Sequence, residues 1–187
     1  MEQITIDTYS FDELSEKVQE RVIAEYDTSD DANIFLESST DQMREKIWGA
    51  GFSNVRLYYS LSYSQGDGFS FTARIEDLEK FLRKHKLLTK YRKVVRAGGE
   101  FSVVKSCHQY QHKYTVDVAY TLEDCKGSEL AEELVKEITA IVHSLCDECE
   151  KMGYDAIEYA CSREAIMDAI RGHQLRFTKE GGTSYYI

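Results

Sequence analysis

The chain has 187 residues, of which 42% are hydrophobic and 30% are charged, as is ordinary for a folded globular protein. A membrane-spanning helix needs about 20 consecutive apolar residues, and no apolar run in this chain approaches that length. Residues 1–3 lack the basic and apolar regions of a signal peptide. These features argue against a membrane or exported protein, so we expect a cytoplasmic one. Five cysteines, an odd number, favour free thiols over a disulfide framework.

The net charge of −10 is unevenly distributed along the chain. Residues 1–47 carry a net charge of −9, residues 48–79 carry −2, and residues 114–187 carry −8. Residues 80–113, in contrast, carry +9. Such asymmetry predicts two surfaces that meet two different kinds of partner.

The N-terminal third predicts a short strand and two helices. Residues 2–8 alternate apolar and polar side chains, which is typical of a strand. Ser10 and Glu13 have the spacing of a capping box, and apolar residues then recur at helical spacing, which predicts a helix over residues 11–26. Residues 27–31 interrupt the pattern, and a second helix is expected to end near Trp48.

Residues 55–75 predict an antiparallel hairpin with one apolar face and one face rich in hydroxyl groups. Its turn is Gln65-Gly66-Asp67-Gly68, in which the two glycines allow positive φ on either side of the aspartate. A side chain or a backbone amide can therefore be held in a fixed exposed position. These four residues are our candidate partner-binding loop.

The remaining elements complete an α+β fold. We expect a helix over residues 75–86, a turn at 97–99, strands over 101–110 and 113–122, and helices over 128–151 and 155–171. A terminal hairpin would join residues 175–178 to 184–187. The sequence thus predicts one domain, 1–187, with an antiparallel sheet of about five strands and helices packed on one face. Its parts are the hairpin 55–75, the basic segment 80–113 and the C-terminal helical part 128–172.

Cationic residues are concentrated within residues 80–96, where they alternate with Phe81 and Tyr91. Cations neutralise phosphates, and aromatic rings can stack on unpaired bases, so this segment is a candidate nucleic-acid interface. The alternative is a solvated helix face paired with acidic neighbours. The candidate contacts are Lys80, Arg83, Lys84, Lys86, Lys90, Arg92, Lys93 and Arg96.

Two further hypotheses concern acidic and acid–base groups. Carboxylates at positions 12, 13, 16, 20 and 25 could imitate a row of phosphates. The alternative is that the acidic helix face is simply exposed to solvent, as is usual. Acid–base cleavage of RNA would need a histidine to exchange a proton with a 2′-hydroxyl group. The groups available for it are His85, His108, His112, Asp117 and Asp67, and the alternative is a set of ordinary surface residues.

Metal and cofactor sites are not expected. His143, Cys146 and Cys149 have ligand types that zinc favours, but a CxxC within a long helix arises readily by chance. The motifs GxSxG, GxGxxG, HExxH and the Walker loop are absent from the sequence. We therefore expect no cofactor and no metal.

Three stretches, residues 8–26, 59–75 and 154–182, together resemble a family of small, mostly uncharacterised proteins of phages, prophages and plasmids. The most specific part is the hairpin sequence SQGDG at residues 64–68, and some members are labelled antitoxin-like. This chain differs in its single tryptophan and its 13 tyrosines. The resemblance implies an accessory protein of a mobile element, in the cytosol of the host cell, but it supplies no catalytic residues.

Accessory proteins of this size and acidity include anti-CRISPR proteins. By analogy, we expect a non-enzymatic inhibitor that binds a nucleic-acid-guided host defence nuclease, its guide RNA, or both. The alternatives are a metal-independent ribonuclease that trims guide RNA and an antitoxin-like protein that occludes a toxin. A homodimer is compatible with each of them.

Overall fold

The computed structural model describes residues 7–123 and 128–182. The chain forms two compact units: unit 1 comprises residues 1–37 and 155–187, and unit 2 comprises residues 38–154. Most of the expected first strand and the whole of the expected last strand lie outside the described residues. Within those residues, no helix has both the length and the apolar character needed to cross a bilayer.

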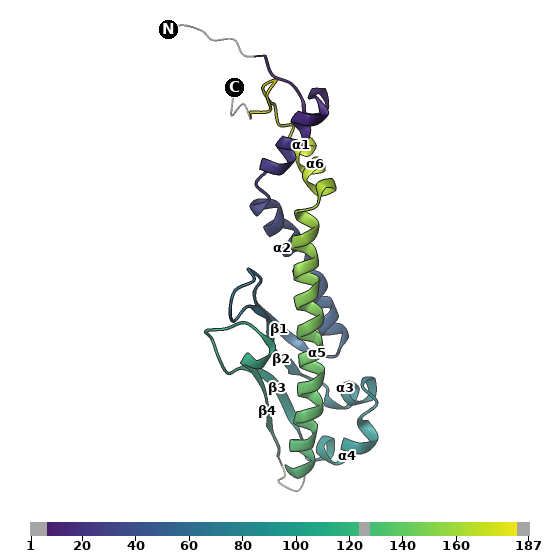
Figure 1. The fold of residues 1–187 in the computed structure, drawn as a ribbon. Coiled ribbons are helices and arrows are strands. Elements are labelled where there is room, and N and C mark those ends of the chain that lie inside the picture. The colour runs from purple at the N-terminus through teal and green to yellow at the C-terminus, as the bar shows by residue number, and fades with distance from the viewer. Residues whose placement is uncertain (1–6, 124–127, 183–187) are drawn as a thin grey trace, which may run out of the picture. The chain divides into compact units, whose positions relative to one another are not determined.

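Unit 2 is built on a four-stranded antiparallel sheet in the order β1-β2-β3-β4 (Figure 1). The strands are β1 (Ser53–Ser60), β2 (Gly68–Ile75), β3 (Glu100–Lys105) and β4 (Val116–Thr121). The α+β class is confirmed, but the expected number of about five strands is too high for the described residues. Tyr9, beside the expected N-terminal strand, pairs only with Phe177 of unit 1, in an isolated bridge.

One face of the sheet carries the main hydrophobic core. In β2, Phe69, Phe71 and Ala73 alternate with polar residues and are almost fully buried. They pack in one cluster with residues of α2 (Ser29–Gly49), α3 (Leu78–Lys84), α4 (Leu88–Arg96) and α5 (Ser128–Ala160). The opposite face carries Arg56 and Arg74, whose side chains are exposed. Strand periodicity therefore separates an apolar, helix-covered face from a polar one.

Two of the differences from the predicted helices concern α4 and α5. Helix α4 was not predicted, because basic residues dominate its sequence and only Tyr91 and Val94 are buried. Helix α5 continues through Gly153, where the sequence predicted a break between two helices. A glycine inside a helix costs about 1 kcal/mol relative to alanine, which the packing of a long amphipathic helix outweighs. The real end comes at Ala160, and Ser162 then accepts a hydrogen bond from the Ala165 N–H to begin α6 (Arg163–Gly172).

The connections of the sheet are longer than predicted. The β1–β2 loop starts after Ser60 because the Asp67 carboxylate accepts hydrogen bonds from the Ser62 and Ser64 N–H groups, both at 2.7 Å. Strand β3 ends at Lys105, short of the expected residue 110, and a 3₁₀ turn, η2 (Lys113–Thr115), precedes β4. The long β3–β4 connection packs on the hairpin loop, and these two loops together close one end of the sheet.

Unit 1 has a small core of its own. The predicted first helix is divided into a 3₁₀ turn, η1 (Phe11–Glu13), and α1 (Glu16–Glu25), because Leu14 and Ser15 adopt extended conformations. Phe11, Val22, Ile170 and Phe177 are buried together in a second cluster.

The two units differ in charge. Unit 1 holds 16 acidic and 6 basic residues, a net charge of −10, whereas unit 2 holds 17 of each and is neutral. All of the net charge therefore belongs to unit 1.

Candidate nucleic-acid interface

Helices α3 and α4 present the predicted cations to solvent. Asp77 caps α3 by accepting a hydrogen bond from the Lys80 N–H at 2.8 Å, and Leu78, Phe81 and Leu82 are buried. The apolar face is thus fixed in the core, which turns the cationic residues outward. We call these eight exposed residues the basic surface: Lys80, Arg83, Lys84, Lys86, Lys90, Arg92, Lys93 and Arg96.

Carboxylates of the described residues neutralise two of the eight cations. Arg83 pairs with Glu79, and Lys90 reaches Glu133 at 3.4 Å and Glu137 at 3.3 Å on α5. Across the described part of the chain, no ion pair joins any of the other six to an acidic side chain. The alternative hypothesis, a solvated helix face paired with acidic neighbours, therefore explains two of the eight residues of the basic surface.

Three arginines border a hollow between α3 and α4 of about 370 Å³. Arg92 and Arg96 are four residues apart on α4, so their side chains lie on the same helix face. Arg83 approaches from α3, and one carboxylate, that of Glu79, shares the lining. Guanidinium groups bind phosphate oxygens through paired N–H donors, so this hollow can accept a phosphate group.

A second cationic hollow lies on the open face of the sheet and was missed by sequence reasoning. It measures about 750 Å³ and is lined by Arg56, Arg74 and Trp48, together with uncharged residues. Trp48, near which the second helix was expected to end, is 52% exposed. Exposed aromatic rings stack on unpaired bases and arginines contact the phosphates between them. The alternation of apolar and polar residues in the predicted hairpin places both arginines on its polar face. This pattern could have located the hollow from the sequence.

The five candidate acid–base residues have different surroundings in the structure. The His85 ring lies 2.8 Å from the Ala50 carbonyl oxygen and packs on Phe81. His112 caps η2 by accepting from the Tyr114 N–H, while His108 and Asp117 are exposed elsewhere. Among the described residues, no hydrogen bond or ion pair links any two of the five.

Asp67 acts as a structural acceptor in the hairpin loop. Its carboxylate accepts hydrogen bonds from the Ser60 hydroxyl at 2.6 Å and from the backbone and hydroxyl of Ser62. Hydrogen bonds from Ser60 and from the Ser64 N–H lower the pKa of Asp67 to about 2. A carboxylate this acidic is a poor proton acceptor near neutral pH.

In the remainder of the candidate loop, the glycines lie against the β3–β4 connection. Gly66 faces the Tyr110 ring, and Gly68 faces the backbone and Cβ of His112. Gln65 is exposed and available to a partner.

The candidate zinc ligands lie in the hydrophobic core. Cys146 and Cys149 are fully buried in α5, and burial raises the pKa of both thiols, that of Cys149 to about 12. His143 packs edge-on against Tyr114, at 5.2 Å between ring centroids. Within residues 7–123 and 128–182, no three His, Cys, Asp or Glu side chains are grouped to hold a metal ion. The pair of thiols is therefore part of the packing of α5 against the sheet.

The fold and this interface define a class: an α+β protein with an antiparallel sheet, helices on one face and a basic helical surface. Residues 35–163 match the model of a family described as a domain of unknown function, DUF8835. Because the match covers more than half of the chain, the protein belongs to this family. No curated protein and no solved structure matches the chain. The whole basic surface lies inside the matched residues.

Proposed function

We propose that this protein is a nucleic-acid-binding protein without enzymatic activity, which contacts a phosphate backbone through the basic surface. The observation that carries the proposal is the set of six exposed cations on α3 and α4 that no described carboxylate neutralises. Unit 2 is neutral as a whole, yet these six cations lie on one surface and repel one another. Bound phosphates would neutralise them and remove that repulsion. The hollow bordered by three arginines gives the surface a place for one phosphate.

Single-stranded RNA is the ligand that we propose. The open-face hollow offers Trp48 for stacking and Arg56 and Arg74 for phosphates, which is the combination used to bind unpaired nucleotides. A guide RNA bound to a defence nuclease presents such a strand. Together with the resemblance to phage and plasmid proteins, this favours an inhibitor of a nucleic-acid-guided host nuclease that binds the enzyme, its guide RNA, or both.

The binding test is fluorescence anisotropy of a labelled single-stranded RNA at several salt concentrations. If six phosphates are neutralised, log K should fall with log salt with a slope of about −4. The variant Arg92→Gln/Arg96→Gln should bind more weakly and reduce the slope by about 1.4, because two contacts are lost. The matched control, Lys136→Gln/Lys151→Gln, removes two exposed cations of α5 outside the basic surface and should behave as the wild type. Equal behaviour of the two variants would rule the basic surface out as the interface.

The inhibition test is a paired assay with a CRISPR effector nuclease that follows both the guide RNA and cleavage of target DNA. Intact RNA with blocked cleavage supports the proposed inhibitor, and Lys84→Glu/Arg92→Glu/Lys93→Glu should restore cleavage. Shortened RNA would instead favour the ribonuclease. If neither the guide RNA nor the cleavage of target DNA changes, the antitoxin-like function becomes the favoured alternative.

A further inference from the structure

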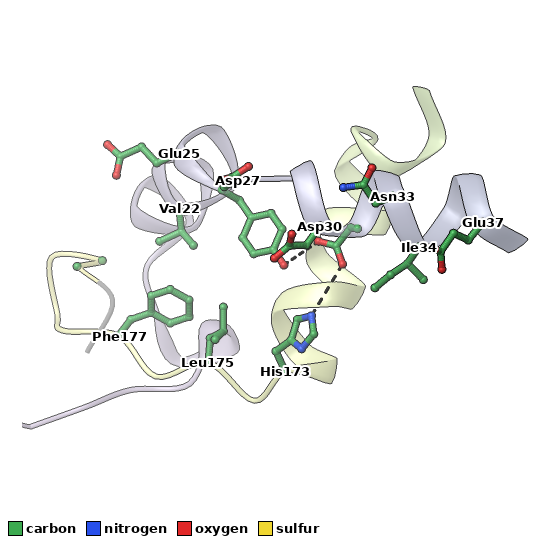
Figure 2. Close-up of a pocket in the computed structure, with 14 residues that line it drawn as sticks. Val22, Glu25, Asp27, Asp30, Asn33, Ile34, Glu37, His173, Leu175 and Phe177 are labelled. Carbon is green, nitrogen blue, oxygen red and sulfur yellow. Dashed lines mark hydrogen bonds and ion pairs between the residues drawn. The ribbon is translucent and has the colours of Figure 1, made fainter. Parts of the chain in front are cut away.

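Unit 1 contains a cavity of about 760 Å³ that none of the functions above uses. It is formed by α1, the first turns of α2 and the segment that follows α6, as Figure 2 shows. Five carboxylates and one histidine, His173, are among the residues that line it, and no lysine or arginine is. These carboxylates are Glu25, Asp27, Asp30, Asp31 and Glu37.

The floor of the cavity is apolar. Val22 from α1 and Leu175 and Phe177 from the C-terminal segment point into the same space (Figure 2). Phe177 and Val22 belong to the core of unit 1, so the floor is fixed in position by packing. At the side, Ile34 on α2 is 61% exposed and adds apolar surface to the rim. The cavity therefore offers apolar contact area beneath a ring of negative charge.

Two of the acidic groups are held by internal hydrogen bonds. Asp31 accepts from the Tyr26 hydroxyl at 2.9 Å and lies 3.8 Å from His173 Nε2. Asp27 accepts from the Ser29 hydroxyl and N–H, which lower its pKa and keep it ionised. Within the described residues, no hydrogen bond or ion pair is recorded for the carboxylates of Glu25 and Asp30. These two are available to a ligand.

We infer that this cavity docks a basic amphipathic segment of a partner protein, with an aliphatic side chain on the floor and arginine or lysine side chains at the acidic rim. Charge complementarity selects this occupant, because unit 1 carries a net charge of −10 and no lysine or arginine lines the cavity. An anionic or purely apolar segment would leave the carboxylates of Glu25 and Asp30 without counter-charges. Long cationic side chains satisfy both requirements, since their stems are apolar and their heads are charged.

This docking surface is independent of nucleic-acid binding, which the basic surface of unit 2 carries. The lining residues come from α1, its connection to α2, the first turns of α2 and the C-terminal segment, and all except Glu37 lie outside the residues that match the family. The docking surface is thus almost entirely a feature of the part of the chain outside the family match.

The test uses the full chain and three labelled peptides of equal length in a fluorescence anisotropy titration: alternating Arg and Leu, alternating Arg and Ser, and alternating Glu and Leu. The Arg/Leu peptide should bind most tightly and the Glu/Leu peptide should not bind. Glu25→Gln/Asp30→Asn should weaken binding of the Arg/Leu peptide by about tenfold, because two ion pairs are lost. Ile34→Ser should weaken the Arg/Leu peptide and leave the Arg/Ser peptide unchanged.

The matched control is Glu16→Gln/Glu158→Gln, which removes two exposed carboxylates of unit 1 outside the cavity. It should bind as the wild type does. If it weakens binding as much as Glu25→Gln/Asp30→Asn, the attraction is general and the inference is overturned. It is also overturned if the full chain binds no peptide while a chain ending at Gly182 does, because residues 183–187 would then be the occupant. Binding of RNA is unaffected in either case, so the two proposals fail separately.

Discussion

The ring of Tyr110 covers Gly66 so closely that a Cβ atom at Gly66 would lie 2.0 Å from Tyr110 Cδ1. Gly66 also has φ +88°, a conformation that other residues rarely adopt, and its carbonyl oxygen accepts a hydrogen bond from the Gln111 N–H at 3.1 Å. The hairpin loop is thereby attached to the β3–β4 connection. A glycine that the sequence assigned to a partner-binding loop is therefore also required by the fold.

Replacing Gly66 should destabilise unit 2. We expect Gly66→Ala to lower the free energy of unfolding by about 2 kcal/mol or more, because it adds both backbone strain and overlap with Tyr110. Urea unfolding followed by circular dichroism measures it. Gly49→Ala is the control, since nothing lies within 4 Å of its Cβ position, and it should change stability by less than about 1 kcal/mol. Equal effects would mean that Tyr110 moves away without cost.

Asp67 should make stability depend on pH in the acid range. Its folded-state pKa is lowered from 3.8 to about 2, so the carboxylate stabilises the fold above pH 4, and this stabilisation is lost as the pH falls towards 2. Asp67→Asn keeps one oxygen that can accept from Ser62 and Ser64, but it loses the negative charge and the acceptor that faces the Ser60 hydroxyl. The difference in melting temperature between wild type and variant should be constant above about pH 5 and shrink below pH 4. A difference that is unchanged at low pH would contradict the role of the carboxylate.

Lys105 is held by uncharged acceptors at the end of β3. Its ammonium group donates to the Thr115 hydroxyl at 2.7 Å, the Ser70 hydroxyl at 2.9 Å and the Tyr110 carbonyl at 3.0 Å, and it lies over the Tyr58 ring. Burial lowers the pKa of this lysine. Lys105→Met should cost about 2 kcal/mol of stability, because buried hydroxyl groups lose their donor.

Thermal and urea unfolding of Lys105→Met measure this loss. The exposed Lys136→Met on α5 is the control and should leave stability unchanged within about 0.5 kcal/mol. If both variants unfold at the wild-type midpoint, the hydrogen bonds of Lys105 add nothing to the fold.

Trp48 reports on the open-face hollow, because it is the sole tryptophan of the sequence. If a base stacks on its ring, single-stranded RNA should quench and shift its emission. Arg56→Gln/Arg74→Gln should reduce the quenching, whereas Lys136→Gln/Lys151→Gln should not. Unchanged emission, under conditions where anisotropy shows that RNA is bound, would confine binding to the basic surface.

The cysteines should differ in their reactivity with a thiol reagent. Backbone N–H groups of Tyr110 and Gln109 lower the pKa of Cys107, whereas burial raises the pKa of Cys146 and Cys149. At pH 7 we expect Cys107 to be modified early, and Cys146 and Cys149 only after unfolding in urea. Mass spectrometry of digested protein identifies the modified positions, and Cys107→Ser is the control for the early phase. Early modification of Cys146 would show that α5 opens in the native state.

Periodicity alone located the hairpin, the α+β class and the long C-terminal helical part. Alternating apolar residues in β2 must face one side of a strand, and Leu134, Ile138 and Leu145 recur at the spacing of a helix face. The charge of the basic segment was equally visible, because a lysine or arginine is cationic wherever the chain places it. These properties are local, so neighbouring residues suffice to determine them.

Contacts between distant residues decided the remainder. Tyr9 pairs with Phe177 from the other end of the chain, and Asp67 became a structural acceptor instead of a proton acceptor because three serines surround it. The acidic cavity joins residues from both ends of the chain, and neither end shows an apolar floor on its own. Long-range packing selects among conformations and partners that local sequence leaves equally favourable, and for that reason only the tertiary structure could define these sites.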